Sequence, residues 1–434
     1  MRNPPSGAGT PEALTPRRPR TVREAWRDNP MWRRLYLART ASLVGNWLNT
    51  LAIVHLIGAT TNVGALAYAA VFVIKQLPTV LLGPPAGVVA DRFSRRTVML
   101  TCDVLCAVLA LSFLGLTPGE HGQWVYVLAA LQIGVTTFFE PARQAATPDL
   151  VAPRDLVAAN TLASATWSVT FAVGTMGGGI VLAFVGWRSA MVLDALSYAI
   201  SAALILGIRL PPHGVRASDG AAPRDALGLD SMREAGRYLR AHPVVAHMLA
   251  AKGVWATFGA VSLFLTVLGI DERFWIMGSQ DLGIATLWTA RAVGTGLGPV
   301  LVRLYTGESL FRLRRSVTWG FVLTMFGYGL LPFASDPWTA VPLVVMAHLG
   351  GAIVWVMSTV VLQLTVDAHV RGRLFAAELA LLMLMSSVTT VAWAAYMDLL
   401  GHTLGEAIWG SVALLLVAWL AWCAAGVRAR RVAP

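Results

Sequence analysis

The amino-acid sequence predicts an all-α integral membrane protein whose twelve transmembrane helices form two pseudo-symmetric six-helix bundles. The first observation is composition. Of the 434 residues, 56% are hydrophobic and 13% are charged, whereas about 25% of the residues of a soluble protein are charged. The second is that apolar stretches of the roughly twenty residues needed to span a bilayer recur about a dozen times. The third is that short stretches repeat half a chain apart, which indicates a duplicated six-helix unit.

The predicted spans follow from hydropathy, with a charged or turn-forming segment between neighbours. In chain order they cover residues 35–57, 63–89, 97–116, 123–139, 156–185, 188–208, 243–269, 275–304, 316–334, 338–364, 374–399 and 404–427. Residues 1–34 and 428–434 remain as tails. The first tail is rich in Pro and Arg and lacks a continuous apolar core, so we expect disorder there rather than a cleavable signal peptide.

The distribution of basic residues predicts the orientation of these spans. Lys and Arg gather in the tails and in every second loop, beginning with the loop after the second span, while the opposite loops contain only Arg188 and Arg273. Because basic residues are retained on the cytoplasmic side, we expect both termini in the cytoplasm and the chain in the inner membrane of the cell. The net charge of +11 is then an orientation signal, and no nucleic-acid partner is expected.

Signatures of other chemistries are missing from the sequence. The three cysteines, Cys102, Cys106 and Cys423, lie within apolar spans, which favours small buried side chains over disulfides or metal ligands. No cluster of His, Cys and carboxylates has metal-ligand spacing, and no Walker loop or convincing pair of nucleophile and base is present. We therefore expect no metal, no cofactor and no enzymatic activity.

A polar segment between the sixth and seventh spans divides the chain into two halves, residues 35–208 and 243–427. The segment, residues 209–242, is irregular from Pro211 to Leu229, as expected of a linker. A short helix is predicted from Asp230 to Ala241, lying on the cytoplasmic membrane surface with its arginines towards anionic head groups.

Two sequence matches support the duplication. The fourteen residues from Thr147 to Asn160 align without gaps with Thr365 to Glu378, and five positions agree. Leu82-Gly83-Pro84, near the end of the second span, recurs as Leu297-Gly298-Pro299 near the end of the eighth. Because both matches fall at equivalent places in the two halves, we expect a transport site between the bundles.

The loop between the second and third spans carries a specific motif. It reads Gly87-x-x-x-Asp91-Arg92-x-x-Arg95-Arg96 and resembles the signature loop of the major facilitator superfamily, with Ser94 where a second glycine is usual. Three further stretches resemble the macrolide-efflux and enterobactin-exporter branch of its drug:proton antiporters. These are Phe138 to Arg143, Leu156 to Asn160 and Arg371 to Phe375.

The resemblance implies that the signature loop acts as a cytoplasmic gate. In that interpretation Gly87 allows close helix approach, Asp91 caps or pairs across the interface of the halves, and Arg95 pairs with an acid at the end of the fourth span. Glu140 is the candidate acid, with Arg143 one turn beyond. Such a pair must break when the other face opens. The alternative is that Arg92, Arg96 and the other charges of this loop are only solvated orientation signals.

The fifth span contains Gly174-Thr175-Met176-Gly177-Gly178-Gly179, which resembles the glycine motif of antiporter members, with Thr175 in place of the proline. Gly174, Gly178 and Gly179 would then belong to an antiporter site. Close helix packing alone would also require them.

Polar residues within the spans are the candidates for a central cavity. Arg39, Asn46 and Asn49 share one helical face of the first span, which either lines an aqueous cavity or packs against another helix. Lys75 and Arg291 lie near the middle of the second and eighth spans, where an unpaired charge costs about 2.5–3.5 kcal/mol. We expect the positive charges of Lys75 and Arg291 to be balanced either by an anionic group of the substrate or by a structural ion pair. Two further cavity candidates are Lys252 and Trp255.

Four acids are candidates for proton or ion coupling: Asp103, Asp194, Asp281 and Glu378. Asp103 and Glu378 are expected near the cytoplasmic end of the membrane, and Asp194 and Asp281 nearer the outside. His55 and His348 could relay protons because histidine titrates near neutrality, although lone helical histidines are more often simply hydrogen-bonded.

These features together predict a secondary active transporter that exports amphipathic small molecules, such as a drug, siderophore or natural product, by alternating access coupled to protons. The expected partners are membrane lipids, a small-molecule substrate and a proton or other ion, and the chain is expected to be monomeric. Two alternatives remain open at this point: a lipid or lysophospholipid translocator of the same fold, and a membrane sensor that transports nothing.

Overall fold

The computed structural model describes residues 21–59, 64–117, 122–152, 155–210, 236–307 and 309–432. Across these ranges the chain is helical and no strand is present, apart from one isolated bridge between Ile276 and Ser279. Eleven segments of the described chain are long and apolar enough to cross a membrane, judged by length and composition. The one predicted span not among these eleven is the eighth, which corresponds to helix α11 (Gln280–Thr306); its hydropathy is lowered by Arg291 and by many Gly and Thr residues.

The first half of the chain contains a short entry helix and six long ones. They are α1 (Val22–Asp28), α2 (Pro30–Gly58), α3 (Ala65–Arg92), α4 (Arg95–Ser112), α5 (Gly122–Leu150), α6 (Leu156–Phe184) and α7 (Trp187–Leu206). The second half contains α9 (Pro243–Ala256), α10 (Val261–Ile270), α11, α12 (Leu310–Leu330), α13 (Pro337–Thr365), α14 (Ala368–Leu400) and α15 (Leu404–Val432). Single 3₁₀ turns cover Phe113–Gly115, Glu272–Phe274 and Leu331–Phe333.

Helix packing repeats from one half to the other. In the first half α3 packs on α5, α4 on α5 and α7, and α2 on α6 and α7; in the second half α11 packs on α13, α12 on α13 and α15, and α9 on α14 and α15. The contacts that join the halves obey the same relation, because α6 packs on α11 and α14 packs on α3. This correspondence confirms the predicted fold class of two pseudo-symmetric bundles.

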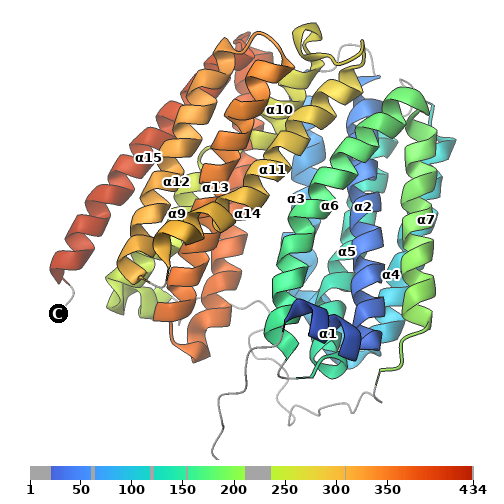
Figure 1. The fold of residues 1–434 in the computed structure, drawn as a ribbon. Coiled ribbons are helices and arrows are strands. Elements are labelled where there is room, and N and C mark those ends of the chain that lie inside the picture. Colours follow the sequence, from blue (N-terminus) through green and yellow to red (C-terminus); the bar gives the residue numbers. More distant parts are fainter. Residues whose placement is uncertain are drawn as a thin grey trace, which may run out of the picture.

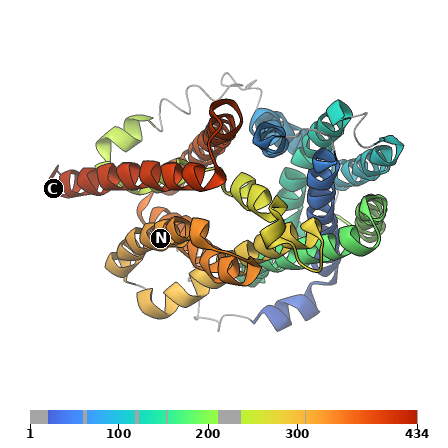
Figure 2. The ribbon, with the colours of Figure 1, turned by 90° about the horizontal axis from the view of Figure 1, so that it is seen from above.

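The two bundles stand side by side and are inclined to each other (Figures 1 and 2). We call the end at which α2 begins and α15 finishes the tail end, and the opposite end the far end. At the tail end, α1 lies across α6 (Figure 1). Asn29, which follows α1, donates to Asp155 Oδ2 at 2.9 Å and accepts from the Ala152 backbone at 3.2 Å, so α1 is tied to the start of α6.

Arginines close the tail end of α7. Arg34 donates to the Gly207 carbonyl at 2.6 Å, and Arg96 donates to the Leu206 carbonyl. The last carbonyls of a helix have no partner within the helix and carry partial negative charge. Two guanidinium groups from α2 and α4 therefore stabilise this terminus and fix α7 against its neighbours.

The seventh span was predicted as one helix over residues 243–269 and is instead broken between α9 and α10. Gly259 lies in the break, and a Cβ there would come within 2.8 Å of Ser386 Cα on α14. The close approach of α14 therefore requires glycine at this position.

Hydroxyl groups replace the helical hydrogen bonds that the break removes. Ser386 and Thr390 donate to the Gly259 carbonyl at 3.2 and 3.3 Å, Thr389 donates to Ala256 at 3.2 Å, and Ser411 donates to Phe258 at 3.2 Å. A carbonyl without a partner is costly inside a bilayer, and such breaks are tolerated where other groups satisfy the backbone.

Large apolar side chains are exposed along the outward faces of α4, α7, α12 and α15, the third and sixth helices of each bundle. Those on α4 and α15 include Val104, Leu105, Val108, Leu111, Leu414, Val417 and Leu420. Such surfaces are unusual for a soluble monomer and fit contact with lipid. The first half of the predicted linker helix Asp230–Ala241 falls outside the described residues; residues 236–241 are helical.

Candidate transport site and gates

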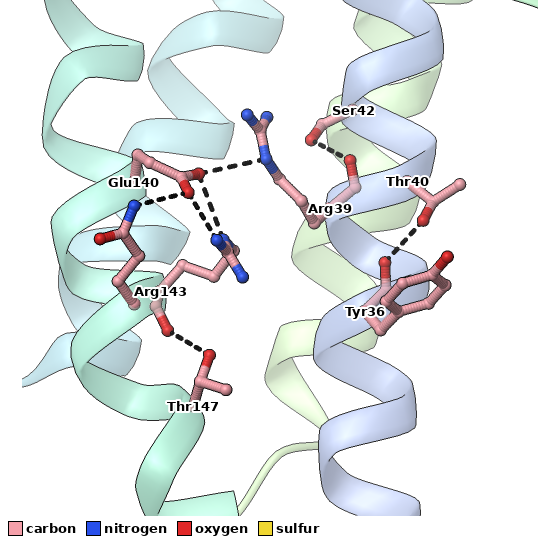
Figure 3. A network of polar contacts seen from close by, with 8 residues as sticks. Tyr36, Arg39, Thr40, Ser42, Glu140, Arg143 and Thr147 are labelled. Carbon is pink, nitrogen blue, oxygen red and sulfur yellow. Dashed lines mark hydrogen bonds and ion pairs between the residues drawn. The ribbon is translucent and has the colours of Figure 1, made fainter. Parts of the chain in front are cut away.

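Glu140 on α5 is the centre of a charged cluster in the first half (Figure 3). Its carboxylate is 3.2 Å from Arg39 Nε on α2 and 2.5 Å from Arg143 Nη2 one turn along α5. Gln144 also donates to it at 3.0 Å. Figure 3 shows both guanidinium groups pointing to the same carboxylate. The cluster ties α2 to α5, and it brings Arg39 together with two residues that were predicted to belong to a gate.

The prediction that Arg95 pairs with Glu140 is wrong. Arg95 forms an ion pair with Asp149 instead. The physical reason is that α5 does not end near residue 139 but continues to Leu150 through Pro141 and Pro148. Nine residues of helix separate Glu140 from Asp149, about 13 Å of rise. Only Asp149 is therefore level with the start of α4.

Other residues of the signature loop have varied surroundings. No described atom lies within 4 Å of the position that a Cβ at Gly87 would take, so the close approach expected there is absent from this conformation. Arg92 is exposed, and Arg96 bonds the end of α7. The side chain of Asp91 lies outside the described residues.

The polar face of α2 is directed partly into its own bundle. Asn49 is 2% exposed and its amide is 3.4 Å from Met191 Sδ on α7. The expectation that Asn49 faces a central cavity is therefore wrong, because the α2–α7 contact covers it. Asn46 remains partly exposed, while Arg39 reaches α5.

Lys75 and Arg291 lie near the middle of the second span of each half, although the two positions are not strictly aligned. Lys75 Nζ on α3 donates to Thr50 on α2 at 2.5 Å, and Arg291 Nη1 on α11 donates to Ser262 on α10 at 2.7 Å. Each base thus bonds a hydroxyl on the first span of its own half. Neither has an ion-pair partner within the described part of the chain.

Arg291 also lies at the interface between the halves. Its guanidinium is 5.4 Å from the ring centroid of Phe171 on α6 and 5.9 Å from that of Trp288 on α11. Aromatic faces attract a cation, which partly offsets the cost of holding this charge in the membrane.

Lys252 belongs to an ion pair inside the second half. Its Nζ is 2.7 Å from Glu378 Oε2 on α14 and 2.8 Å from Thr359 Oγ1 on α13, and it lies over the Trp355 ring at 4.9 Å. The side chains of the pair are 8% and 4% exposed. Their contacts join three helices of one bundle. Lys252 therefore has a structural role that could replace its predicted role in the cavity.

Trp255, the remaining cavity candidate, packs against Gly351 on α13, where a Cβ would come within 3.0 Å of its Nε1. His348 is also bonded within its bundle, with Nε2 2.7 Å from the Tyr328 hydroxyl. Both residues therefore have packing roles in this conformation.

The glycines of α6 lie at close helix contacts. A Cβ at Gly174 would come 2.6 Å from Trp47 Cβ, and one at Gly179 would come 2.2 Å from Ala285 Cβ on α11. Gly178 faces the α2 backbone at Leu48, 3.2 Å away.

Thr175, which stands where the antiporter motif has proline, is 3.1 Å from Thr289 on α11. One helix therefore packs tightly against its own half and against the other half.

Polar contacts across the halves gather at the far end. His55 Nδ1 on α2 is 3.0 Å from the Asp281 carboxylate on α11. Asp398 on α14 accepts from the backbone N–H groups of Ala65 and Leu66 at 2.9 and 2.8 Å, at the start of α3. Carboxylates are favoured at helix N-termini. The sequence analysis did not predict that Asp398 contacts the start of α3. The signal available for it was an acid at the far end of one span, because the beginning of another span at that end offers free N–H groups.

Asp103 and Asp194, predicted at different depths, are both buried in the core of the first half, on helices that pack against each other. Asp103 on α4 is 2% exposed and Asp194 on α7 is fully buried. Gln132 on α5 donates to Asp194 Oδ2 at 2.9 Å. The two acids therefore lie behind α2 and α5 rather than at the interface of the halves.

Within the described residues, eleven apolar spans and α11 form two related bundles that carry bases at mid-depth, which is the architecture of a secondary transporter. The chain belongs to the Major Facilitator Superfamily, whose family model matches residues 35–387. This finding confirms the resemblance of the signature loop.

Similar proteins agree with this assignment. The chain is 25% identical to the tetracycline resistance protein, class C, of Escherichia coli over 74% of this chain and 77% of that protein. It is 24% identical to BacE of Bacillus subtilis (strain 168), whose name provisionally assigns it bacilysin export, over 73% and 77%. The crystal structure of the nucleoside transporter NupG superposes with a TM-score of 0.70 at 14% identity, covering 91% and 98%. That likeness supports the fold alone.

Proposed function

We propose that this transporter is a secondary active exporter of amphipathic small molecules, working by alternating access of the two bundles and coupled to protons. In this proposal the tail end faces the cytoplasm, as the basic loops indicate, and both termini are cytoplasmic. The signature-loop residues with Glu140 and Arg143 act as the cytoplasmic gate.

The observation that carries the proposal is the distribution of contacts between the bundles. Among the described residues, the polar contacts across the halves are those of His55 with Asp281, Asp398 with the start of α3, and Thr175 with Thr289. All lie between the far end and the middle. Charged groups at the tail end, such as Arg95 with Asp149, pair within one half. This arrangement supports a state closed at the far end, in which opening requires only that a few polar contacts break.

The names of two relatives support export as the direction. One is a tetracycline resistance protein and the other is provisionally assigned the export of bacilysin. Export moves a compound out of the cell, and a transporter that moved an antibiotic in this direction would give resistance to it. The apolar and aromatic residues around Arg291, namely Phe171 and Trp288, would suit a ligand with an apolar ring system.

Transport into liposomes tests the proposal. The purified chain is expected to move antibiotics or fluorescent amphipathic dyes when a proton gradient is imposed, and not with a sodium gradient or with none. Movement under sodium alone would overturn proton coupling. If no compound of this class moved under any gradient while circular dichroism showed a folded protein, the exporter itself would be refuted.

A second candidate is the translocation of lipids or lysophospholipids, and one observation favours it. Lys75 and Arg291 lie about 15 Å along their helices from the far end, and both lack a carboxylate partner within the described residues. An anionic head group would supply that partner.

Charge reversal at these two positions distinguishes the candidates. For a lipid translocator, Lys75→Glu and Arg291→Glu should abolish movement of a fluorescent anionic lipid and spare neutral dyes, because only the lipid needs the positive charge. Lys75→Arg and Arg291→Lys keep the charge and serve as controls. Lipid movement that is absent in the wild type, or unchanged by reversal, would reject this candidate.

A further inference from the structure

Four buried oxygen atoms without a hydrogen-bond partner lie on α4 and on α7, which packs against both α4 and α2. They are Asp103 Oδ2, Asp194 Oδ1, the Tyr198 hydroxyl and Ser201 Oγ. None of the four residues is more than 3% exposed. Buried polar atoms in native proteins nearly always have a partner, so each exception asks for an explanation. Four unpartnered buried oxygen atoms on two adjoining helices suggest a binding site for a small ion.

Helical spacing explains how these groups come together. Asp194, Tyr198 and Ser201 are at i, i+4 and i+7 on α7 and share one face, and α4 packs on α7. The Tyr198 hydroxyl is close enough to interact electrostatically with both carboxyls. Ser201 lies beside Asp103 without a well-formed hydrogen bond. Tyr198 therefore links the two acids within one buried polar region of the first bundle.

The basic groups that face the site are engaged elsewhere. Arg39, from α2, pairs with Glu140 at 3.2 Å. Lys75, from α3, donates to Thr50. Neither forms an ion pair with Asp103 or Asp194, although each interacts with one of these acids at longer range.

The remaining groups around the acids do not offset their charge. Gln132, from α5, donates to one oxygen of Asp194, and the Asn49 amide, from α2, is near the same carboxyl; both are neutral. The titratable neighbours are the thiols of Cys102 and Cys106 on α4 and the Tyr198 phenol. A buried carboxylate that lacks an ion-pair partner is unfavourable, and such groups tend to become protonated instead. We therefore expect at least one of the two acids to bind a proton.

We propose that Asp103 and Asp194, with Tyr198 and Ser201, form a proton-binding site in the core of the first bundle, away from the interface that admits substrate. The inference rests on the proposed function, since it names the groups that couple proton and substrate movement. We take the bound species to be a proton, because the described residues contain no group of three or more His, Cys, Asp or Glu side chains that could hold a metal ion.

Arg39 provides a route for exchange of the proton. It already interacts electrostatically with Asp103 and Tyr198 while bonded to Glu140. When the contact with Glu140 opens, the guanidinium can turn to Asp103 and favour its ionised form. The O–H bond of the carboxyl then breaks, the proton leaves to water, and the positive charge of Arg39 takes its place. The gate at Glu140 and the proton site are thereby linked.

Infrared difference spectroscopy of the purified full chain tests the site without relying on transport. The wild type should show a protonated-carboxyl band that disappears as pH rises, and Asp103→Asn or Asp194→Asn should remove or shift it. Tyr198→Phe, a conservative change that deletes one hydroxyl, should move the pH at which the band disappears. Glu272→Gln alters an exposed acid outside the spans and should change nothing.

Transport by the same variants completes the test. Asp103→Asn and Asp194→Asn are expected to lose proton-driven transport and to keep exchange of substrate across a membrane without a gradient. A wild type without the band, or variants with the wild-type band and normal proton-driven transport, would overturn the site. A titrating band that the two Asn variants lose, in a protein that moves substrate without protons, would refute the proposed coupling and leave the site standing.

Discussion

Gly179→Ala is expected to reduce transport by about tenfold or more while the protein stays folded. The new Cβ would lie 2.2 Å from Ala285 Cβ and 3.1 Å from the Asp281 carbonyl on α11. Neither neighbour is the end of a flexible side chain, so α6 and α11 must separate. Overpacking of this kind costs about 1–3 kcal/mol, and about 1.4 kcal/mol changes an equilibrium tenfold. The closed far end is thereby disfavoured, and the protein spends less time in this state.

Gly177→Ala is the matched control for this prediction. Gly177 is on the same helix, two residues away, and a Cβ there would meet nothing within 4 Å. Both substitutions gain the same helix propensity, about 1 kcal/mol, so their difference isolates the contact with α11. Initial rates of dye transport in liposomes measure it. Equal rates for the two variants would contradict a functional contact between α6 and α11.

Lys252→Met is expected to lower stability more than any other single change considered for this chain. It leaves the Glu378 carboxylate buried without its cation, and breaking a buried pair in this way costs about 3–5 kcal/mol. Lys252→Met combined with Glu378→Gln removes both charges and should recover most of the loss. The melting temperature in detergent, followed by circular dichroism, reports the effect.

Arg273→Met provides the comparison, because Arg273 pairs with Asp271 on an exposed loop and solvent screens such pairs; little change is expected. Transport by the double variant separates the two roles of Lys252. A stable double variant that transports normally establishes a structural pair, and a stable one that fails establishes a role in transport. A double variant as unstable as Lys252→Met would contradict the argument from buried charge.

Much of the fold could be predicted from composition and periodicity, because lipid imposes a simple pattern on the chain. The spans and the duplication were read from apolar runs and short repeats. The equivalence of Lys75 and Arg291 followed from their place in the second span of each half, and both donate to a hydroxyl on the first span. These features are encoded locally, so one sequence suffices to find them.

The contacts that could not be predicted depend on where helices end and on how deep side chains lie in the membrane. The extension of α5 past Pro141 placed Asp149 opposite Arg95, whereas hydropathy ends the span where charge begins. Asp103 is about 12 Å from the tail end of α4 and Asp194 about 18 Å from that of α7, one helical turn apart in depth. Counting along apolar runs placed them on opposite sides of the membrane. Pairing between helices is decided by tertiary packing, which no local pattern encodes.

The broken seventh span has a consequence for how the protein is made. Helix α9, with fourteen residues, is about 21 Å long, too short to cross the roughly 30 Å apolar layer by itself. The carbonyls of Ala256, Phe258 and Gly259 accept hydrogen bonds from hydroxyl groups on α14 and α15. These two helices are the last to leave the ribosome. During synthesis these carbonyls therefore lack their hydrogen-bond donors until the end of the chain has been made. We expect the second bundle to become resistant to proteolysis only once α15 has been inserted.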